Sequence, residues 1–309
     1  MLTEQICDRI RNKELNYIIV LYTEFRKVVS MIIDCHTHLA APEHLYGEFY
    51  KGAKKAWSDD LGLACSHAEH AEAYKDIDAA IVFPLDAAEI GYATPNEYVA
   101  QYVNASGGKI TGFASVNPNR IDAVELLIHA VRDLGLKGLK LAPIYQLFDP
   151  SDARVFPLYA KAEELGIPIM WHQGTSFVEH GPLEYANPVL LDPVARAFPG
   201  RKMIIAHLGH PWYAETACVI RKHPNMYSDM SALSTRPWQM YNAMVTVMEY
   251  GVQDKIFFGT DFPFFTVEQT VSAFRDINRI VYGTNLPKIP EEVIEAIIHR
   301  DTLSVLGLR

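Results

Sequence analysis

Cysteine is scarce in this chain, and no two cysteines lie close together in the sequence. Four occur among the 309 residues, at Cys7, Cys35, Cys65 and Cys218. Because there is no Cys-x-x-Cys pair, neither a zinc ribbon nor a disulfide framework is expected. Widely separated cysteines are typical of a reducing compartment, so we expect a cytoplasmic protein.

Positive charge is also in short supply. The 28 Lys and Arg residues are outnumbered by 37 Asp and Glu residues, which gives a formal net charge of −9. A surface that binds nucleic acid or an anionic membrane would need clustered Lys and Arg. We therefore expect neither of these partners.

Near the N-terminus, no apolar run is long enough to cross a bilayer. The longest, at residues 17–22, falls far short of the about 20 residues that a spanning helix needs. It also lacks the small-residue cleavage site of a signal peptide, and Glu4 and Asp8 dilute the positive start. Residues 1–30 precede a second methionine, Met31, and are interpreted as an N-terminal arm or as an upstream-start extension.

Eight apolar runs recur along the rest of the chain, separated by stretches with helical spacing. Such near-continuous runs are typical of strands that are buried on both faces, as in parallel sheets. They occupy residues 31–36, 79–83, 110–116, 138–141, 167–172, 202–207, 225–230 and 255–261. The alternation predicts an α/β fold, a (β/α)8 TIM barrel formed by residues 31–309 as a single domain. An open doubly wound sheet is the alternative, but no Gly-x-Gly-x-x-Gly follows the first run.

Two stretches depart from an even repeat. The connection between the first two predicted strands, residues 39–78, is long enough to suggest a functional lid. It contains an aromatic-rich segment at 42–57 and a helical pattern at 67–74. Residues 290–306 are predicted to form an extra C-terminal helix that closes the barrel.

Five side chains suited to metal binding or proton transfer follow predicted strands. His36 and His38 are two residues apart, so in a strand they point to the same face. His172, His207 and Asp261 each end a later run. Since the active site of a barrel lies at the C-terminal ends of its strands, we expect these residues to meet there. Imidazole and carboxylate ligands suit Zn²⁺, or Fe²⁺ or Mn²⁺, and such an ion activates a bound water.

The remaining histidines show no such placement and are interpreted as ordinary core or surface residues. They include His67, His70, His129, His180, His223 and His299.

These motifs resemble the amidohydrolase superfamily, in particular the amidohydrolase-related branch with aminocarboxymuconate-semialdehyde decarboxylase and resorcylate-type decarboxylases. The matching segments span nearly all of the chain after residue 30 and are specific for the family, although not for a substrate. They are Ile-Asp-Cys-His-Thr-His at 33–38, Gly-Leu-Lys-Leu at 138–141, Trp-His at 171–172, Ile-Ala-His-Leu-Gly at 205–209 and Gly-Thr-Asp-Phe-Pro at 259–263.

The resemblance implies a metal site and its catalytic neighbours. His36, His38, His172 and Asp261 match the ligands of a single divalent ion, commonly Zn²⁺. His207 matches the residue that acts as general acid or base or orients the attacking water, and Asp261 is also placed to take a proton from that water. The resemblance further implies a small-molecule substrate and a possible homodimer.

Four more residues are predicted near the substrate. Lys140 matches the bridging lysine of binuclear relatives, but in this branch it is expected to be solvated or to face the substrate. The segment after His207 departs from the glycines common in the family, and His210 there is either a polar group over the site or a helix-start residue. Trp212 is predicted to wall the pocket. Arg236 is a candidate clamp for a substrate carboxylate.

Two reactions fit this set of residues. One is hydrolysis of an amide, ester or lactone by metal-activated water. The other is non-oxidative decarboxylation of an aromatic or muconate-type acid, in which His207 supplies the proton that replaces carbon dioxide. Hydrolysis is placed first, because no cationic clamp is evident after the first strand. A metal-free lactone- or sugar-binding barrel is a third reading, which the intact ligand set disfavours.

Overall fold

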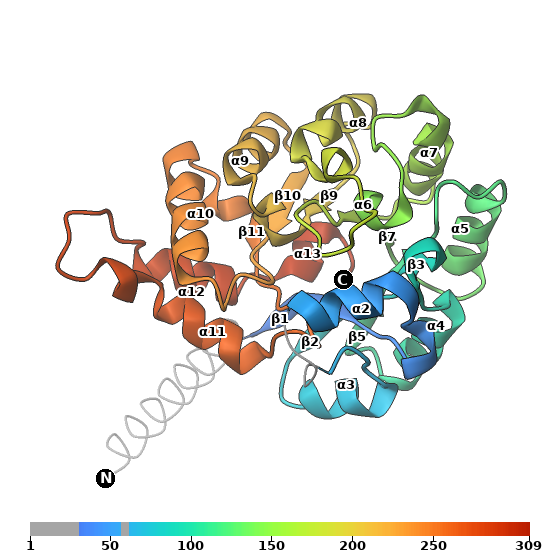
Figure 1. Cartoon of the computed structure of the whole chain (residues 1–309), viewed down its shortest axis with the longest axis horizontal. Helices are drawn as coiled ribbons and strands as arrows, with labels where there is room; N and C mark the ends of the chain where they lie inside the picture. The colour runs from blue at the N-terminus through green and yellow to red at the C-terminus, as the bar shows by residue number, and fades with distance from the viewer. Residues whose placement is uncertain (1–30, 57–61) are drawn as a thin grey trace, which may run out of the picture.

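Parallel strands form the centre of the molecule, and helices surround them (Figure 1). The computed structural model describes residues 31–56 and 62–309, so the predicted arm at 1–30 lies outside the described residues. The strands of the barrel are β1 (Ile33–His38), β2 (Ala79–Phe83), β5 (Ile110–Gly112) with β6 (Ala114–Ser115), β7 (Leu139–Leu141), β8 (Ile169–Trp171), β9 (Met203–Ile205), β10 (Met226–Asp229) and β11 (Ile256–Phe257). β5 and β6 are one strand interrupted at Phe113, so the eight predicted runs are confirmed as strands.

Hydrogen bonds between the first and last strands close the sheet. The ladders run in the orders β1-β2-β5 and β11-β10-β9-β8-β7-β6. The Cys35 N–H donates to the Phe258 carbonyl at 3.0 Å, and the His38 N–H donates to the Phe262 carbonyl at 2.7 Å. These bonds join β1 to the segment that follows β11, which completes the predicted (β/α)8 barrel.

Apolar side chains fill the barrel and also coat its outside. Ile33, Cys35, Phe113, Met170 and Phe257 belong to one buried cluster of residues from the strands. A second, larger cluster packs the outer faces of the strands against the helices. Burial on both faces explains why the strands read as continuous apolar runs.

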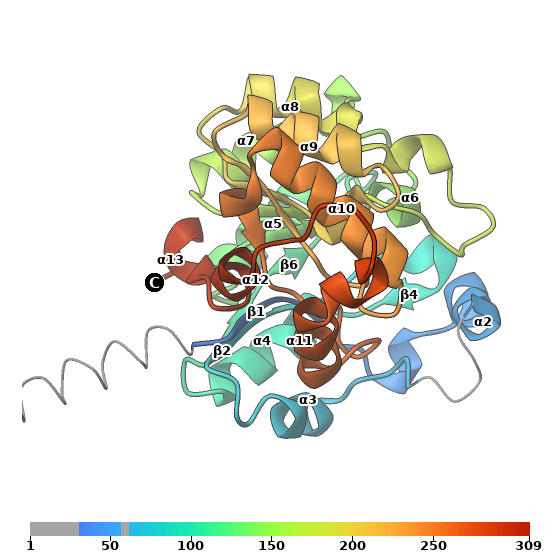
Figure 2. The same cartoon turned by 90° about the vertical axis from the view of Figure 1, so that its left-hand side faces the viewer.

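Helices flank the strands, as the spacing predicts, and Figure 2 shows them from the side. Those between the connection after β1 and the C-terminal helices include α4 (Asn96–Ala105), α5 (Ala123–Arg132), α7 (Phe156–Glu164), α8 (Leu191–Ala197), α9 (Tyr213–Lys222), α10 (Pro237–Tyr250) and α11 (Val267–Arg275). Within residues 31–56 and 62–309, no helix has both the length and the apolar character needed to cross a membrane.

The two irregular stretches contain more structure than the sequence predicts. The connection after β1 carries α2 (Gly47–Ala56) and α3 (His67–Ala73). α2 brings Phe49 and Ala56 to the main pocket, as a lid would, whereas α3 makes hydrogen bonds to β1. The predicted C-terminal helix is present as two helices, α12 (Glu291–Ile298) and α13 (Thr302–Leu306), because Asp301 begins a new helix by accepting a hydrogen bond from the Ser304 N–H.

Candidate active site

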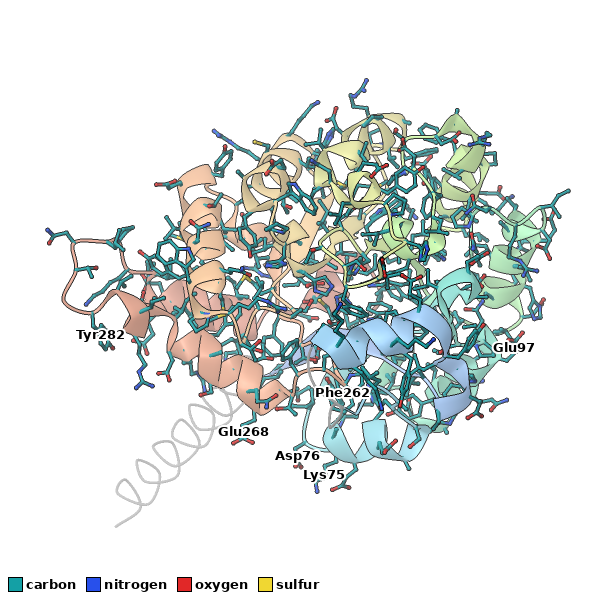
Figure 3. The ribbon with its side chains drawn as sticks, in the orientation of Figure 1. Lys75, Asp76, Glu97, Phe262, Glu268 and Tyr282 are labelled. Carbon is teal, nitrogen blue, oxygen red and sulfur yellow. The ribbon has the colours of Figure 1, made fainter. Side chains whose placement is uncertain are left out.

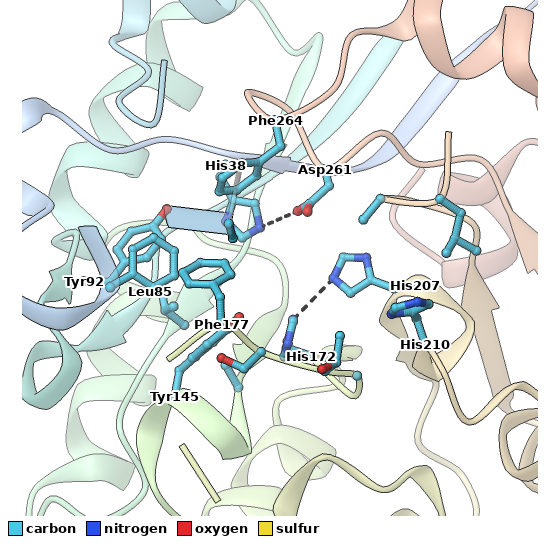
Figure 4. Close-up of a pocket in the computed structure, with 18 of the residues that line it drawn as sticks. His38, Leu85, Tyr92, Tyr145, His172, Phe177, His207, His210, Asp261 and Phe264 are labelled. Carbon is cyan, nitrogen blue, oxygen red and sulfur yellow. Dashed lines mark hydrogen bonds and ion pairs between the residues drawn. The ribbon is translucent and has the colours of Figure 1, made fainter. Parts of the chain in front are cut away.

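Three of the predicted metal ligands converge on one point at the C-terminal end of the barrel. His36 Nε2 lies 3.2 Å from His38 Nε2 and 3.4 Å from Asp261 Oδ1. His38 Nε2 lies 3.3 Å from the same Asp261 oxygen (Figure 4). The three side chains are buried, with Asp261 the most exposed at 9 %. The two histidines of β1 and the aspartate after β11 therefore form a compact trio, as the sequence predicts.

Asp229, at the end of β10, sets which nitrogen of His36 carries the proton. Its Oδ2 lies 2.8 Å from His36 Nδ1, and both side chains are fully buried. Burial acts to raise the pKa of Asp229, but the charge and hydrogen bond of His36 hold that pKa below its ordinary value. An ionised carboxylate only accepts hydrogen bonds, so the proton of His36 sits on Nδ1. His36 Nε2 therefore carries a lone pair, and this atom faces His38 and Asp261.

The same carboxylate orients His207, which follows β9. Asp229 Oδ1 accepts hydrogen bonds from the Ser231 hydroxyl and from the His207 N–H, the latter at 2.9 Å. Since Ser231 gives its only proton to Asp229, its oxygen accepts from His207 Nδ1 at 2.7 Å. In the neutral ring, Nε2 is then the nitrogen without a proton and can act as a base.

His172 completes the group from the opposite side of the pocket. Its Nδ1 lies 3.3 Å from His207 Nε2 (Figure 4). When His207 is neutral, the proton of this bond belongs to His172 Nδ1. His172 Nε2 is left buried and without a hydrogen-bond partner among the described residues. His172 lies beside His207, outside the close trio.

The donor set suits a divalent cation. Three potential ligand atoms, His36 Nε2, His38 Nε2 and Asp261 Oδ1, stand 3.2–3.4 Å apart. Ligand atoms about 2.1 Å from a tetrahedral ion lie roughly 3.4 Å apart, which matches these separations. His172 lines the same pocket, and its buried, unpartnered Nε2 offers a third nitrogen and a fourth donor atom. His36, His38, Asp261 and His172 are thus the residues that could hold the ion.

Burial keeps these nitrogen bases unprotonated at neutral pH. Burial, assisted by the positive charge of Lys140, lowers the pKa of His36 to about 3. Burial also lowers the pKa of His38, and it lowers that of His172 well below its ordinary value. Metal ions bind deprotonated ligands, so the electrostatics of the site favour occupation by a cation.

Strained backbone places two of the site residues. His207 and Asp261 have φ values of 59° and 71°, in the left-handed region that disfavours residues with a Cβ. Hydrogen bonds hold both conformations: the Asp261 N–H donates to the His36 carbonyl at 2.8 Å, and the His207 N–H donates to Asp229. Strain of this kind tends to occur at functional sites, where surrounding structure compensates for it.

A pocket of about 190 Å³ opens onto this group. One side of it is aromatic: the ring of Phe49 on α2 lies 4.9 Å from that of Tyr92 and 5.1 Å from that of Phe177. Tyr145 continues this wall, and its ring lies 4.7 Å from that of His172. In Figure 4, Tyr92, Tyr145 and Phe177 lie to the left of His172, whereas His207 and His210 lie to its right.

The predicted substrate residues divide by position. Lys140, His210 and Arg236 line the pocket, whereas Trp212 packs against the apolar cluster that contains Phe49 and is not among the lining residues. Lys140 is 1 % exposed, so the solvated role is wrong and the substrate-facing one stays a prediction. Its Nζ donates to His36 Nε2 at 3.1 Å, and burial lowers its pKa to about 8.

Sequence reasoning missed two groups of site residues. Asp229 ends a predicted strand, as the ligands do, and that position was the available signal. Ser231 and the aromatic wall carry no local pattern that marks them. Tyr92 and Tyr145 reach the pocket from connections after β2 and β7, so only the folded chain shows their place.

Comparison with known proteins agrees with this description. The family model described as amidohydrolase matches residues 33–307. No curated protein sequence matches the chain.

Solved structures share the fold at low sequence identity. An uncharacterised TIM-barrel protein from Bordetella bronchiseptica is similar at 21 % identity and a TM-score of 0.67, covering 90 % of this chain and 99 % of that one. A probable 2-pyrone-4,6-dicarboxylic acid hydrolase from Acinetobacter baumannii is similar at 15 % identity and a TM-score of 0.64. The match covers 89 % of this chain and 99 % of that one. A dihydroxybenzoic acid decarboxylase from a Polaromonas species, with bound manganese and 2-nitroresorcinol, is similar at 16 % identity and a TM-score of 0.64. The match covers 90 % of this chain and 97 % of that one.

The barrel, the ligand trio at the ends of its first and last strands, and the match over residues 33–307 lead to one conclusion. This protein belongs to the amidohydrolase family.

Proposed function

We propose that the protein is a metal-dependent hydrolase that cleaves a C–N or C–O bond of a small molecule with an activated water. The observation that carries the proposal is the buried trio of His36, His38 and Asp261, with the ring of His207 4.8 Å from that of His36. A divalent ion held by the trio and His172 would supply Lewis-acid activation of the water and of the scissile carbonyl.

His207 is the proposed general base and acid. Ser231 and Asp229 hold its ring and keep the proton on Nδ1. Nε2 can therefore accept the proton of the attacking water and then return it to the leaving group. Asp261 has a second oxygen that can assist in orienting the same water, although its main proposed role is as a ligand.

Zn²⁺ is the proposed metal, with Mn²⁺ or Fe²⁺ as alternatives. Three imidazole nitrogens and one carboxylate oxygen are a common donor set for catalytic zinc. Manganese is bound in the similar decarboxylase structure, and the same donor types accept it. The cytoplasm is the proposed location, because Cys35, Cys65 and Cys218 are free thiols.

Decarboxylation is the second candidate, and Arg236 is the observation that favours it. Its side chain lines the pocket, and no described carboxylate forms an ion pair with it. A guanidinium there suits a substrate carboxylate, while the aromatic wall suits a planar ring. In this reaction His207 would deliver a proton to the carbon that loses carbon dioxide. We keep hydrolysis first, because the described α2 residues that line the pocket, Phe49 and Ala56, are apolar.

A substrate panel tests the proposed function directly. Lactones, esters, amides and carboxylated aromatics are incubated with the purified protein, and acid release and carbon dioxide release are followed separately. We expect acid release that a chelator abolishes and added Zn²⁺ restores. Metal-dependent release of carbon dioxide without hydrolysis would replace the first candidate with the second, and turnover that survives complete removal of metal would contradict both.

Substitution of Arg236 tests whether the substrate carries a carboxylate. Because a charge-assisted hydrogen bond contributes roughly 1.5–3 kcal/mol, Arg236→Met is expected to raise KM for a carboxylated substrate by about 10–100-fold. For a substrate analogue with an uncharged group in place of the carboxylate, the same substitution should change KM little. Arg221→Met is the matched control, since Arg221 lies on α9 against the Tyr250 ring, away from the pocket. Equal KM values in Arg236→Met and the unaltered protein would show that this guanidinium does not bind substrate.

A further inference from the structure

The strand that carries the histidine pair contains a bulge at the first ligand. The pairing of β1 with β2 advances from Asp34 opposite Ala80 to Thr37 opposite Val82, so β1 has one extra residue. The Cys35 N–H and the His36 carbonyl both bond to the segment from β11 onward. Such an insertion changes which face later side chains occupy.

The bulge is what allows core and site to share one short strand. Ile33 and Cys35 belong to the apolar cluster inside the barrel, and His36 and His38 point into the site above it. In a regular strand Cys35 and His36 would face opposite sides. Because both turn inward, Asp34 and Thr37 are left facing the outside of the barrel, where α3 lies.

One residue of α3 holds the strand between the two ligands. His70 Nε2 lies 2.9 Å from Thr37 Oγ1, and that hydroxyl donates to the Ile81 carbonyl of β2 at 2.8 Å. The proton of the His70–Thr37 bond therefore belongs to His70 Nε2, and His70 Nδ1 accepts from the Tyr102 hydroxyl at 2.8 Å. Both ring nitrogens are thus used, and His70 is fully buried.

A second residue, Tyr74 directly after α3, holds the part of the strand that precedes the ligands. Tyr74, four residues after His70, donates its hydroxyl to Asp34 Oδ2 at 2.6 Å. Asp34 also accepts from the Thr260 N–H and hydroxyl, and from the His36 N–H that the bulge leaves outside the ladder. Tyr74 and Asp34 thereby connect β1 to the residue that precedes Asp261.

The rings of His70 and Tyr74 also contact Phe262, the residue that follows the third ligand, Asp261. The Phe262 ring lies 5.7 Å from that of His70 and 5.3 Å from that of Tyr74. Figure 3 labels Phe262 next to α3, with Lys75 and Asp76 just beyond the end of that helix. Residues adjacent to His36, His38 and Asp261 in the sequence are therefore all in contact with His70 or Tyr74.

We propose that His70 and Tyr74 are positioning residues for the metal ligands: through Thr37, Asp34, Thr260 and Phe262 they hold the bulged strand and Asp261 in the geometry that binds the ion. This inference rests on the proposed metal site. It assigns a role in metal binding to part of the connection after β1 that does not line the main pocket.

Metal affinity of the full chain tests this role. The dissociation constant for Zn²⁺ is measured by competition with a chromophoric chelator in the unaltered protein, His70→Ala, Tyr74→Phe and Thr37→Val. Loss of groups that orient ligands typically weakens metal binding by about 10–100-fold, and we expect each variant to fall in that range. His67→Ala is the control, because His67 lies on the same helix but bonds to the Tyr98 carbonyl of α4. Its affinity should stay within about twofold.

A spectroscopic measurement separates positioning from general destabilisation. With Co²⁺ in place of Zn²⁺, the visible bands report ligand geometry, so His70→Ala should change their position and intensity while His67→Ala should not. Circular dichroism identifies any variant that fails to fold. If His70→Ala does not fold, the near-isosteric Thr37→Val variant decides whether the positioning role holds. Unaltered Zn²⁺ affinity and Co²⁺ spectra in folded His70→Ala or Thr37→Val would overturn the inference. Failure of the unaltered protein to bind Zn²⁺ or Co²⁺ would instead overturn the metal site itself, and this role with it.

Discussion

Replacing His38 with alanine is expected to abolish stoichiometric metal binding and to lower turnover by roughly 10³-fold or more. His38 Nε2 is one of the three atoms of the ligand trio, 3.2 Å from His36 Nε2 and 3.3 Å from Asp261 Oδ1. A bound Lewis acid contributes several kcal/mol of transition-state stabilisation, and each 1.36 kcal/mol is a tenfold change in rate. Metal content per chain, measured by atomic emission on the dialysed protein, checks the first part without any substrate.

His38 is a better target than His36 for this measurement. His36 Nδ1 bonds to the buried Asp229, so its removal also leaves a buried carboxylate without a partner. His38 Nδ1 has no hydrogen-bond partner among the described residues, so its removal disturbs folding less. His129→Ala, on the surface of α5, is the control, and its metal content should equal that of the unaltered protein. If His38→Ala retained one tightly bound ion per chain, the assignment of the trio as the metal site would be contradicted.

Replacing His207 with asparagine is expected to leave the metal bound and to lower kcat by about 10²–10⁴-fold. General acid–base catalysis by a positioned side chain contributes an effect of this size. Nε2 is the atom that we assign to proton transfer, and asparagine can still accept or donate near Ser231 but has no basic nitrogen. The substrate identified by the panel is used for the kinetics.

Measuring metal content together with kcat distinguishes a role of His207 in proton transfer from a role as a metal ligand. Loss of kcat with one bound ion per chain supports proton transfer by His207, because a ligand role would lower both. His129→Asn should match the unaltered protein in both measurements. A His207→Asn protein with undiminished kcat would exclude His207 as the general acid or base and shift that role to Asp261.

Much of the fold and part of the site could be predicted from the sequence, because both follow from local patterns. Apolar runs with turn signals between them identify strands, and strands of a barrel present their C-terminal ends at one face. His36, His38 and Asp261 were assigned on that basis, and they do converge. His36 and His38 face the same side although the bulge lies between Asp34 and Thr37, because the register is regular again from Thr37 to His38.

Other residues could not be assigned, because their roles depend on partners far along the chain. Asp229 looks like an ordinary strand end until it is seen to bond His36, 193 residues away. His70 was interpreted as an ordinary histidine, since nothing near it in the sequence indicates that it bonds Thr37. For Lys140 the sequence leaves a solvated and a substrate-facing role open, and burial contradicts the solvated one, because a single lysine in an apolar run does not reveal what surrounds it.

The sequence by itself determined that this protein is an α/β barrel with a histidine pair suited to metal binding at the end of its first strand. The physical reason is that hydrophobic periodicity and residue type act locally and survive any detail of packing. Only the tertiary structure decided which ring nitrogens carry protons, that the pocket has an aromatic side and a polar side, and that α3 holds the ligand strand. Those properties arise from hydrogen bonds and ring contacts between segments as far apart as Asp34 and Thr260, which no local pattern records.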